Sequence, residues 1–278
     1  MARERIGLIG PGRMGLAMVK HLIAARYAVT AYDVDADRLG LAREAGAEVA
    51  SSPAGVGKAC TFVIIAVGHD DETMAAASGE DGLLETMEPG TVIAVSSTVA
   101  PNTVRDLEKA AARKGVYVCD APLCRGRWAA DEGTLLALLG GTDAVVERAR
   151  PVYAAFSSDI HHLGEVGFGQ FAKAMNNFLL WVNGIALIEA GRLSEAVGID
   201  LAKLRQALLI SSGKSQALED WDRMSFTWAL KDMQLVSNMT DEAGLSLPIM
   251  GAIKELTKDA RRIKAENPPD WTGRAKES

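Results

Sequence analysis

Hydrophobic residues in the first half of the chain form short runs, separated by segments with helical spacing. A run that is apolar at nearly every position, such as residues 60–67 (CTFVIIAV), is typical of a strand buried on both faces of a sheet. We expect strands at residues 5–10, 28–33, 47–50, 60–67, 91–97, 115–122 and 135–141, with helices at 13–25, 36–45 and from Pro101 onward. This alternation predicts a Rossmann-type α/β fold with a doubly wound, mostly parallel sheet.

The hydrophobic pattern changes after about residue 164. Apolar residues recur at helical spacing over residues 170–197 without a proline, which predicts one helix of about 40 Å at about 1.5 Å per residue. Three more helical segments follow, at residues 201–210, 227–243 and 249–264. We therefore expect a dinucleotide-binding domain over residues 1–164. An all-α domain over 165–278, joined to it by the long helix, would serve substrate binding and oligomerisation.

Composition narrows the class of protein. The chain has 278 residues and a formal net charge of -6, which argues against nucleic acid as a partner. Its start resembles no signal peptide, and no run of 18 or more apolar residues is present, so we expect a cytoplasmic protein without a membrane partner. Three cysteines and four histidines at unrelated spacings indicate no metal site.

A glycine motif lies between the first expected strand and the first expected helix. It consists of Gly10, Pro11, Gly12, Arg13, Met14 and Gly15, a G-x-G-x-x-G in the context that dinucleotide binding requires. The first glycine permits the tight turn, the second lets a pyrophosphate approach the backbone, and the third lets helix and strand pack closely. The anion would rest on the helix N-terminus.

The ends of three expected strands carry further cofactor candidates. Asp33 ends the second strand, where a carboxylate accepts hydrogen bonds from the adenosine ribose and repels a 2′-phosphate, so NAD is favoured over NADP. Arg38 in the next turn leaves NADP open. Val67 and Thr98 follow the fourth and fifth strands and are candidates to flank the nicotinamide half, because ligands bind at the carboxyl ends of parallel strands.

Polar residues interrupt the apolar face of the long helix near its start. Lys173 and Asn177 are four residues apart and share a helix face, and Asn176 lies beside them. Two amides in a helix interior are unfavourable for helix propensity, which indicates a site rather than a solvated surface.

At this point the chain resembles the β-hydroxyacid dehydrogenase family, the 3-hydroxyisobutyrate dehydrogenase and tartronate semialdehyde reductase group. The resemblance rests on GLIGPGRMG, DAPLCRGRWAADEGTL, GFGQFAKAMNN and LKDMQL, which occur in the family's order over nearly the whole length. It implies an oxidoreductase that interconverts a small 3-hydroxyacid and its semialdehyde with a nicotinamide cofactor. Lys173 would be the general acid/base, Asn177 would orient it and the substrate with help from Asn176, and Thr98 and Lys231 would contact the cofactor.

The chain departs from the family at residues 124–126. Relatives carry Ser-Gly-Gly after Asp-Ala-Pro-Val and hold the substrate carboxylate there, whereas this chain has Cys124, Arg125 and Gly126. A guanidinium is suited to oxyanions, so Arg125 is expected to grip the acid group of the substrate. The sulfolactaldehyde reductase branch is similar in placing an arginine here. A carboxylate, sulfonate, phosphonate or phosphate therefore stays open, as do the roles of Arg127 and Trp128.

Other functions stay open. An imine reductase on the same scaffold would replace the lysine that this chain keeps as Lys173. A catalytically silent nucleotide-binding scaffold would lose it too. Phosphogluconate dehydrogenases share the motifs but have a much longer helical part. The long apolar helix exceeds what a small helical domain can cover, so a homodimer or homotetramer is expected.

Overall fold

The computed structural model describes residues 3–273 and divides the chain into two compact units, Met1–Lys173 and Ala174–Ser278. The division falls inside one long helix, α8 (Phe168–Ala196), so Lys173 belongs to the first unit and Asn177 to the second. The domain boundary expected at residue 164 marks where the helical part begins in the sequence. The division after Lys173 separates two compact units instead, so the expected boundary stays a prediction.

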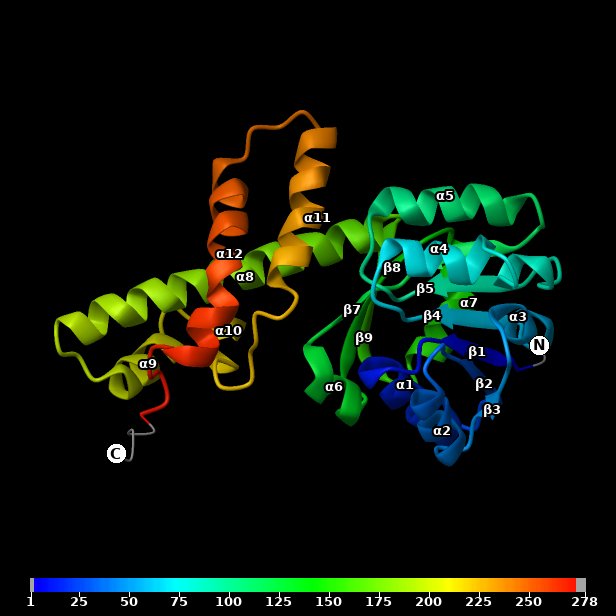
Figure 1. The fold of residues 1–278 in the computed structure, drawn as a ribbon, viewed down its shortest axis with the longest axis horizontal. Coiled ribbons are helices and arrows are strands. Elements are labelled where there is room, and N and C mark those ends of the chain that lie inside the picture. The colour runs from blue at the N-terminus through cyan, green and yellow to red at the C-terminus, as the bar shows by residue number, and fades with distance from the viewer. Residues whose placement is uncertain (1–2, 274–278) are drawn as a thin grey trace. The chain divides into compact units, whose positions relative to one another are not determined.

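The first unit is built on the doubly wound sheet that the hydrophobic runs predict (Figure 1). Its strand order is β3-β2-β1-β4-β5-β6-β8-β7, and β9 pairs with β8. The chain leaves β1 toward β2 on one side and later returns to β4 on the other side, which makes the end of β1 the switch point where such sheets bind ligands. The strands are β1 (Ile6–Ile9), β2 (Val29–Tyr32), β3 (Glu48–Val49), β4 (Phe62–Ile65), β5 (Val92–Val95), β6 (Tyr117–Asp120), β7 (Leu123–Cys124), β8 (Leu135–Gly140) and β9 (Ser157–Gly164).

Helices cover both faces of this sheet, because successive strand residues point to opposite sides. Phe62 and Ile64 of β4 join a core with residues of α1 (Arg13–Ala24) and α7 (Asp143–Tyr153). Val63 and Ile65 join a second core with residues of α3 (Pro53–Ala59), α4 (Asp70–Ser78) and α5 (Pro101–Ala112). Helix α2 (Ala36–Glu44) adds Ala42 to the first core, and a short 3-10 helix, η1 (Leu83–Glu85), adds to the second.

The far edge of the sheet differs from a simple reading of the sequence. The segment after Cys124 is not a plain loop but a short helix, α6 (Gly126–Glu132). Residues 157–164 form β9, although five of its eight residues are polar. This strand pairs with β8 at the edge of the sheet, and most of its residues are partly or fully exposed. A polar edge strand of this kind lacks the apolar run that predicts a buried strand. Helices α3 and α4 also lie outside the elements that the sequence pattern predicted.

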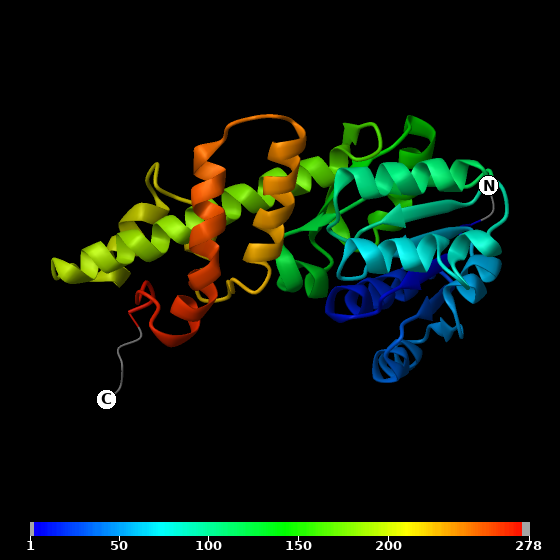
Figure 2. The same ribbon diagram turned by 45° about the horizontal axis from the view of Figure 1, so that its top comes forward.

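The second unit is helical, as expected. It contains α8 after Lys173, α9 (Leu201–Leu209), α10 (Gln216–Glu219), α11 (Ala229–Glu242) and α12 (Pro248–Glu266). Figures 1 and 2 show α11 and α12 side by side, joined by residues 243–247. Trp181, Trp221 and Trp271 are buried in its core, and the Trp181 indole donates to Asp232 Oδ2 at 3.0 Å, which ties α8 to α11.

Helix α8 is also long and apolar enough to span a membrane by length and composition alone, with a mean hydropathy of 1.2 in its most apolar window. Several of its apolar side chains instead lie in the helical core, including Trp181, Ile185 and Ile188. Other apolar residues of α8, including Phe171, Leu179 and Leu193, stay exposed, so burial in this core covers only part of its apolar surface.

Candidate functional site

The glycine loop, residues 10–15, has the geometry that its motif requires. Gly10 adopts φ +88°, which favours glycine, and a Cβ there would lie 2.7 Å from the carbonyl oxygen of Ala66. A Cβ on Gly15 would overlap the carbonyl oxygen of Gly10, so only glycine lets α1 pack this closely on the end of β1. These two glycines serve the backbone itself.

The middle glycine leaves room for a ligand. A Cβ on Gly12 would meet only Arg38 Nη1, at 3.8 Å, and Gly12 caps α1 without a side-chain hydrogen bond. The backbone at the start of α1 is therefore open at Gly12, where only the Arg38 guanidinium comes near. A helix N-terminus of this kind stabilises an anion, so the residues present fit the pyrophosphate of a dinucleotide.

The acidic end of β2 lies beside this loop. Asp33 is buried and accepts a hydrogen bond from the backbone N–H of Asp35 at 3.0 Å. Arg38, more than half exposed, lies 3.5 Å from Asp33 Oδ2 through Nη1 and 3.3 Å from Asp35 Oδ2 through Nε. Both the carboxylate that suits a ribose and the cation that suits a 2′-phosphate are thus present at the same edge.

A buried serine connects the two strand ends expected to flank the nicotinamide half. Ser97 Oγ accepts the N–H of Val67 at 2.8 Å, which holds the loop after β4 against the loop after β5. Thr98 follows directly and is half-buried. Sequence analysis gave Ser97 no role, although a hydroxyl at the end of a buried strand was a signal for such a link.

Lys173 reaches the segment where the family signature changes. Its Nζ donates to Cys124 Sγ at 3.8 Å, and Cys124 is buried at the end of β7. Both residues belong to the first unit, so this contact is independent of how the two units are arranged. The structure therefore brings together the lysine and the cysteine that sequence analysis assigned to catalysis and to substrate binding.

Arg125 has an unusual backbone and a charged neighbour. Its φ of +82° lies in the left-handed region, and Gly126 follows with φ +71°. Its Nη1 donates to Asp159 Oδ2 at 2.7 Å, to Ser158 Oγ at 2.8 Å and to the carbonyl oxygen of Thr134 at 3.0 Å. Hydrogen bonding from Arg125 lowers the pKa of Asp159. A carboxylate of the protein therefore already contacts the guanidinium that we expected to grip the substrate.

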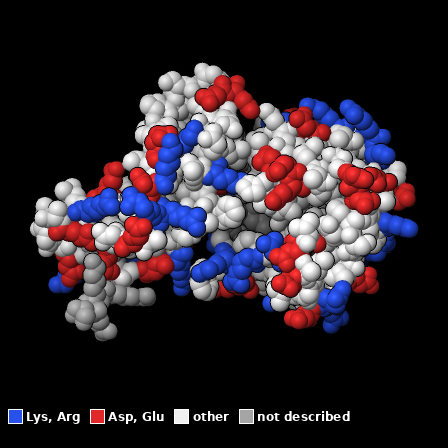
Figure 3. Space-filling model, viewed as in Figure 1, with Lys and Arg blue, Asp and Glu red and all other residues white. Residues whose placement is uncertain are grey.

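The neighbouring charged residues lie at the surface. Arg13 of the glycine loop pairs with Asp131 of α6 at 2.5 Å, and Arg127 packs over the ring of Trp128 with its Cζ 5.0 Å from the ring centre. Figure 3 shows acidic and basic side chains intermixed on the visible face, as expected for a chain with a net charge of -6.

The other predicted residues belong to the second unit. Asn177 is buried one turn beyond Lys173 on α8, and its Oδ1 accepts from Asn176 Nδ2 at 3.0 Å. Lys231 of α11 lies with its Nζ 5.7 Å from the ring centre of Trp228. Their roles toward substrate and cofactor stay predictions.

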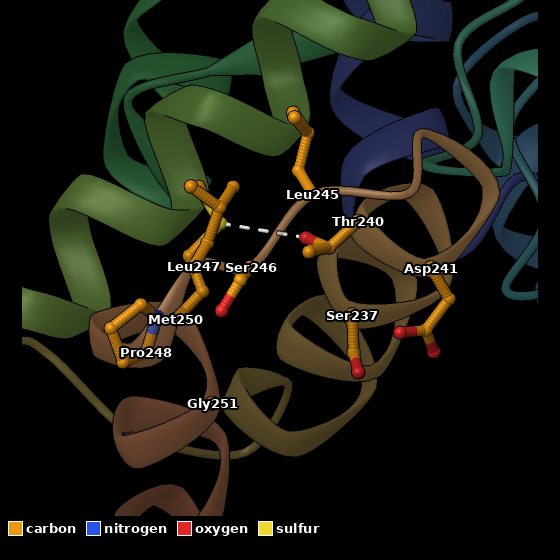
Figure 4. Close-up of a pocket in the computed structure, with 9 residues that line it drawn as sticks. All are labelled: Ser237, Thr240, Asp241, Leu245, Ser246, Leu247, Pro248, Met250 and Gly251. Carbon is orange, nitrogen blue, oxygen red and sulfur yellow. Dashed lines mark hydrogen bonds between the residues drawn. The ribbon is translucent and has the colours of Figure 1, made fainter.

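A hollow of about 210 Å³ also occurs in the second unit, where α11 and α12 meet (Figure 4). Thr240 Oγ1 donates to Met250 Sδ across it at 3.6 Å. The lining offers no cluster of titratable groups, since Asp241 is its one ionisable residue. The hollow therefore adds nothing to the chemistry of the first unit.

Two family models match the chain in sequence. Residues 5–164 match the NAD binding domain of 6-phosphogluconate dehydrogenase, and residues 167–271 match the NAD-binding model of NADP-dependent 3-hydroxyisobutyrate dehydrogenase. Individual relatives agree. Mitochondrial 3-hydroxyisobutyrate dehydrogenase of Rattus norvegicus is 34% identical over 213 residues, 77% of this chain and 64% of the rat protein. NAD-dependent L-serine dehydrogenase of Pseudomonas aeruginosa is 34% identical over 216 residues, 78% of this chain and 72% of that protein.

Solved structures share the fold. A structure of Mycobacterium tuberculosis 3-hydroxyisobutyrate dehydrogenase with L-serine superposes with a TM-score of 0.85, at 24% identity, over 98% of both chains. The sequence match to the rat enzyme spans slightly less than two thirds of that enzyme's length. The resemblance carried by the four motifs is confirmed: the chain belongs to the β-hydroxyacid dehydrogenase family, and its relatives include the 3-hydroxyisobutyrate dehydrogenases.

Proposed function

We propose that this protein is an NAD-dependent dehydrogenase that interconverts a small 3-hydroxyacid and its semialdehyde. The observation that carries the proposal is the contact of Lys173 with Cys124, 3.8 Å from Nζ to Sγ. It brings a proton-carrying side chain to the segment where relatives bind the substrate acid group. The match to the two family models supports the same reaction class.

Each side chain has a stated part in the reaction. The nicotinamide cofactor, when bound, supplies or accepts the hydride. Lys173 donates a proton to the substrate oxygen during reduction and accepts it during oxidation. Asn177, buried one turn along α8, orients the substrate with Asn176. Val67 and Thr98 flank the nicotinamide half, and Lys231 contacts the cofactor.

We infer a preference for NAD from Asp33. Its buried carboxylate suits a ribose with two free hydroxyls and repels a 2′-phosphate. Arg38 is the competing feature, because it could turn from Asp33 to a phosphate. We expect Arg38→Ala to leave activity with NADH nearly unchanged and to lower any activity with NADPH. A loss with NADH alone would show that Arg38 supports the NAD site instead.

The acid group of the substrate is assigned to Arg125 and the backbone of residues 124–126. All described hydrogen bonds of Arg125 leave from Nη1, so its Nη2 edge can still bind an oxyanion while Nη1 stays on Asp159. A carboxylate is the first candidate. A sulfonate or phosphonate is the second, because a guanidinium also suits oxyanions of this kind.

The decisive experiment is a panel of aldehyde acids with carboxylate, sulfonate and phosphonate head groups, each assayed with NADH and NADPH. We expect NADH oxidation with the carboxylate series. Activity confined to a sulfonate or phosphonate would move the protein to that branch. No turnover of any member, with NADH still bound, would favour a silent nucleotide-binding scaffold. Turnover of cyclic imines alone would favour an imine reductase.

We also propose that the protein is a homodimer or homotetramer. Apolar side chains remain exposed along α8 and just beyond it, including Leu179, Leu193 and Val197. Exposed apolar residues in this number favour a protein contact over solvent. Light scattering at micromolar concentration should give a mass of two or four chains, and a monomer mass would refute the proposal.

A further inference from the structure

A carboxylate at the end of β6 caps the helix that carries Lys173. Asp120 is fully buried; its Oδ1 accepts the N–H of Gly167 and its Oδ2 accepts the N–H of Gln170, both at 2.7 Å. Gly167 directly precedes α8 and Gln170 lies in its first turn, where backbone N–H groups have no partner inside the helix. The positive end of the helix dipole faces the same carboxylate. Asp120 therefore fixes where α8 begins relative to the sheet.

Glycines around Asp120 let the backbone approach the carboxylate this closely. A Cβ on Gly169 would lie 2.8 Å from Asp120 Oδ2, and a Cβ on Gly140 would overlap Oδ1. Burial raises the pKa of Asp120, and hydrogen bonds from the N–H groups of Gly167 and Gln170 act in the opposite direction. A carboxylate buried this deeply destabilises the folded protein unless hydrogen bonds satisfy its oxygens.

Gln170 ties the same turn of α8 to the neighbouring strand. Its side chain is fully buried, Nε2 donates to the carbonyl oxygen of Ser97 at 2.7 Å, and Oε1 accepts the N–H of Val99 at 3.2 Å. These two contacts bracket Thr98 on both sides. One amide side chain thus connects the loop expected to flank the cofactor with the helix that carries the lysine.

We propose that Asp120 and Gln170 are positioning residues, which together hold Lys173 in register with Cys124 and Thr98. Lys173 lies three residues after Gln170, about 4.5 Å farther along the helix axis at about 1.5 Å per residue. A shift or rotation of the first turn therefore moves its Nζ directly. The inference rests on the proposed role of Lys173 in proton transfer. Misplacement of a reacting group by about 1 Å can reduce a rate about 100-fold.

The test compares Asp120→Asn and Gln170→Met with a matched control, Tyr153→Phe. Tyr153 is fully buried at the same sheet and bonds to Ser96 Oγ at 2.7 Å, so the control also removes a buried hydrogen bond but makes no contact with α8 among its described interactions. We call Asp120 and Gln170 the anchor and their two substitutions the anchor variants. We expect both anchor variants to lower kcat about 100-fold, with the Kd for NADH and the KM for the aldehyde acid within about threefold of wild type. Tyr153→Phe should lower Tm and keep kcat. Equal kcat values in all three variants would overturn the proposal.

A double-mutant comparison separates positioning from general damage. In the Lys173→Ala background, Gln170→Met should slow the residual reaction no further, because the group that it positions is absent. Rate losses that multiply would overturn the proposal, and Gln170→Met serves this purpose even if Asp120→Asn does not fold.

A measurement that needs no enzyme activity tests the positioning role of Asp120 and Gln170 separately from the proposed function. The rate at which acetic anhydride modifies Lys173, relative to the exposed Lys114, should change at least threefold in the anchor variants and stay constant in Tyr153→Phe. A changed rate without any reductase activity in the wild type would uphold the anchor and refute the proposed function. An unchanged rate in both anchor variants would refute the anchor.

Discussion

The glycine loop after β1 and the turn at residues 124–126 after β7 both place a residue in the left-handed region at the end of a strand. In the loop that residue is Gly10, with φ +88°. In the turn it is Arg125, with φ +82°. A side chain in this conformation costs roughly 1–2 kcal/mol, which glycine avoids. Gly10 therefore adopts the left-handed conformation without steric cost, whereas Arg125 adopts it at the cost of strain from its side chain.

The difference lies in what maintains each conformation. In the glycine loop only backbone atoms are involved: the carbonyl oxygens of Ala66 and Gly10 leave no room for a Cβ on Gly10 or Gly15, so the sequence must carry glycine at both positions. The turn is maintained by contacts of the Arg125 guanidinium with residues 9 to 34 positions away in the sequence. The first region is consequently readable from a short motif. The second depends on β9, an edge strand that the sequence pattern did not reveal.

The largest expected effect comes from the loop. Gly15→Ala forces a Cβ into the carbonyl oxygen of Gly10. We expect the free energy of unfolding to fall by about 3 kcal/mol, the upper end of the usual cost of overpacking, and NADH binding to become undetectable. Differential scanning fluorimetry and NADH titration measure both. Gly12→Ala is the control: its Cβ has open space, so Tm should hold while NADH affinity falls. Equal Tm values for the two variants would contradict the division of roles among the glycines.

A second effect concerns the substrate anion. Removing a charge-assisted hydrogen bond costs about 1.5–3 kcal/mol, so Arg125→Ala should raise KM for the aldehyde acid about 10- to 150-fold. Asp159→Asn should leave KM within about threefold, because the guanidinium remains. Steady-state kinetics on both variants decide the point. If Asp159→Asn raises KM as much as Arg125→Ala does, Arg125 holds the turn and does not bind the substrate.

A smaller effect separates the backbone of the turn from its side chain. Arg125→Gly relieves the left-handed strain, whereas Arg125→Ala retains it, and both lose the exposed ion pair. We therefore expect Arg125→Gly to be more stable than Arg125→Ala by about 1 kcal/mol, as measured by urea denaturation. Equal stabilities would indicate that the turn relaxes in the variants. Arg125 would then carry no strain that Gly10 avoids.

The smallest effect concerns pH. Hydrogen bonds from Arg125 and Ser158 hold the pKa of Asp159 below its ordinary value of 3.8. A lowered pKa means that the stabilisation is present above pH 3.8 and is lost as the pH falls through the pKa of the folded state. The Tm difference between wild type and Asp159→Asn should therefore shrink below about pH 4 and stay constant from pH 5 to 8. A difference that grows on acidification would contradict the pair.

Fold class and family were accessible from sequence because each rests on short local patterns. Apolar runs such as residues 62–65 define buried strands, and the four motifs define the family. The anchor at Asp120 and Gln170 was not accessible, since its partners Ser97, Val99 and Gly167 come from separate segments. A glutamine at the start of an apolar helix was visible in the sequence, but its burial and its hydrogen-bond partners depend on the sheet.

The central claim is that Lys173 transfers the proton in an NAD-dependent reaction on a hydroxyacid or its semialdehyde. The most direct measurement is kcat of Lys173→Ala for the best aldehyde acid, alongside its Kd for NADH. We predict a fall in kcat of about 10²- to 10⁴-fold with an unchanged Kd. A variant that keeps full kcat would contradict the claim.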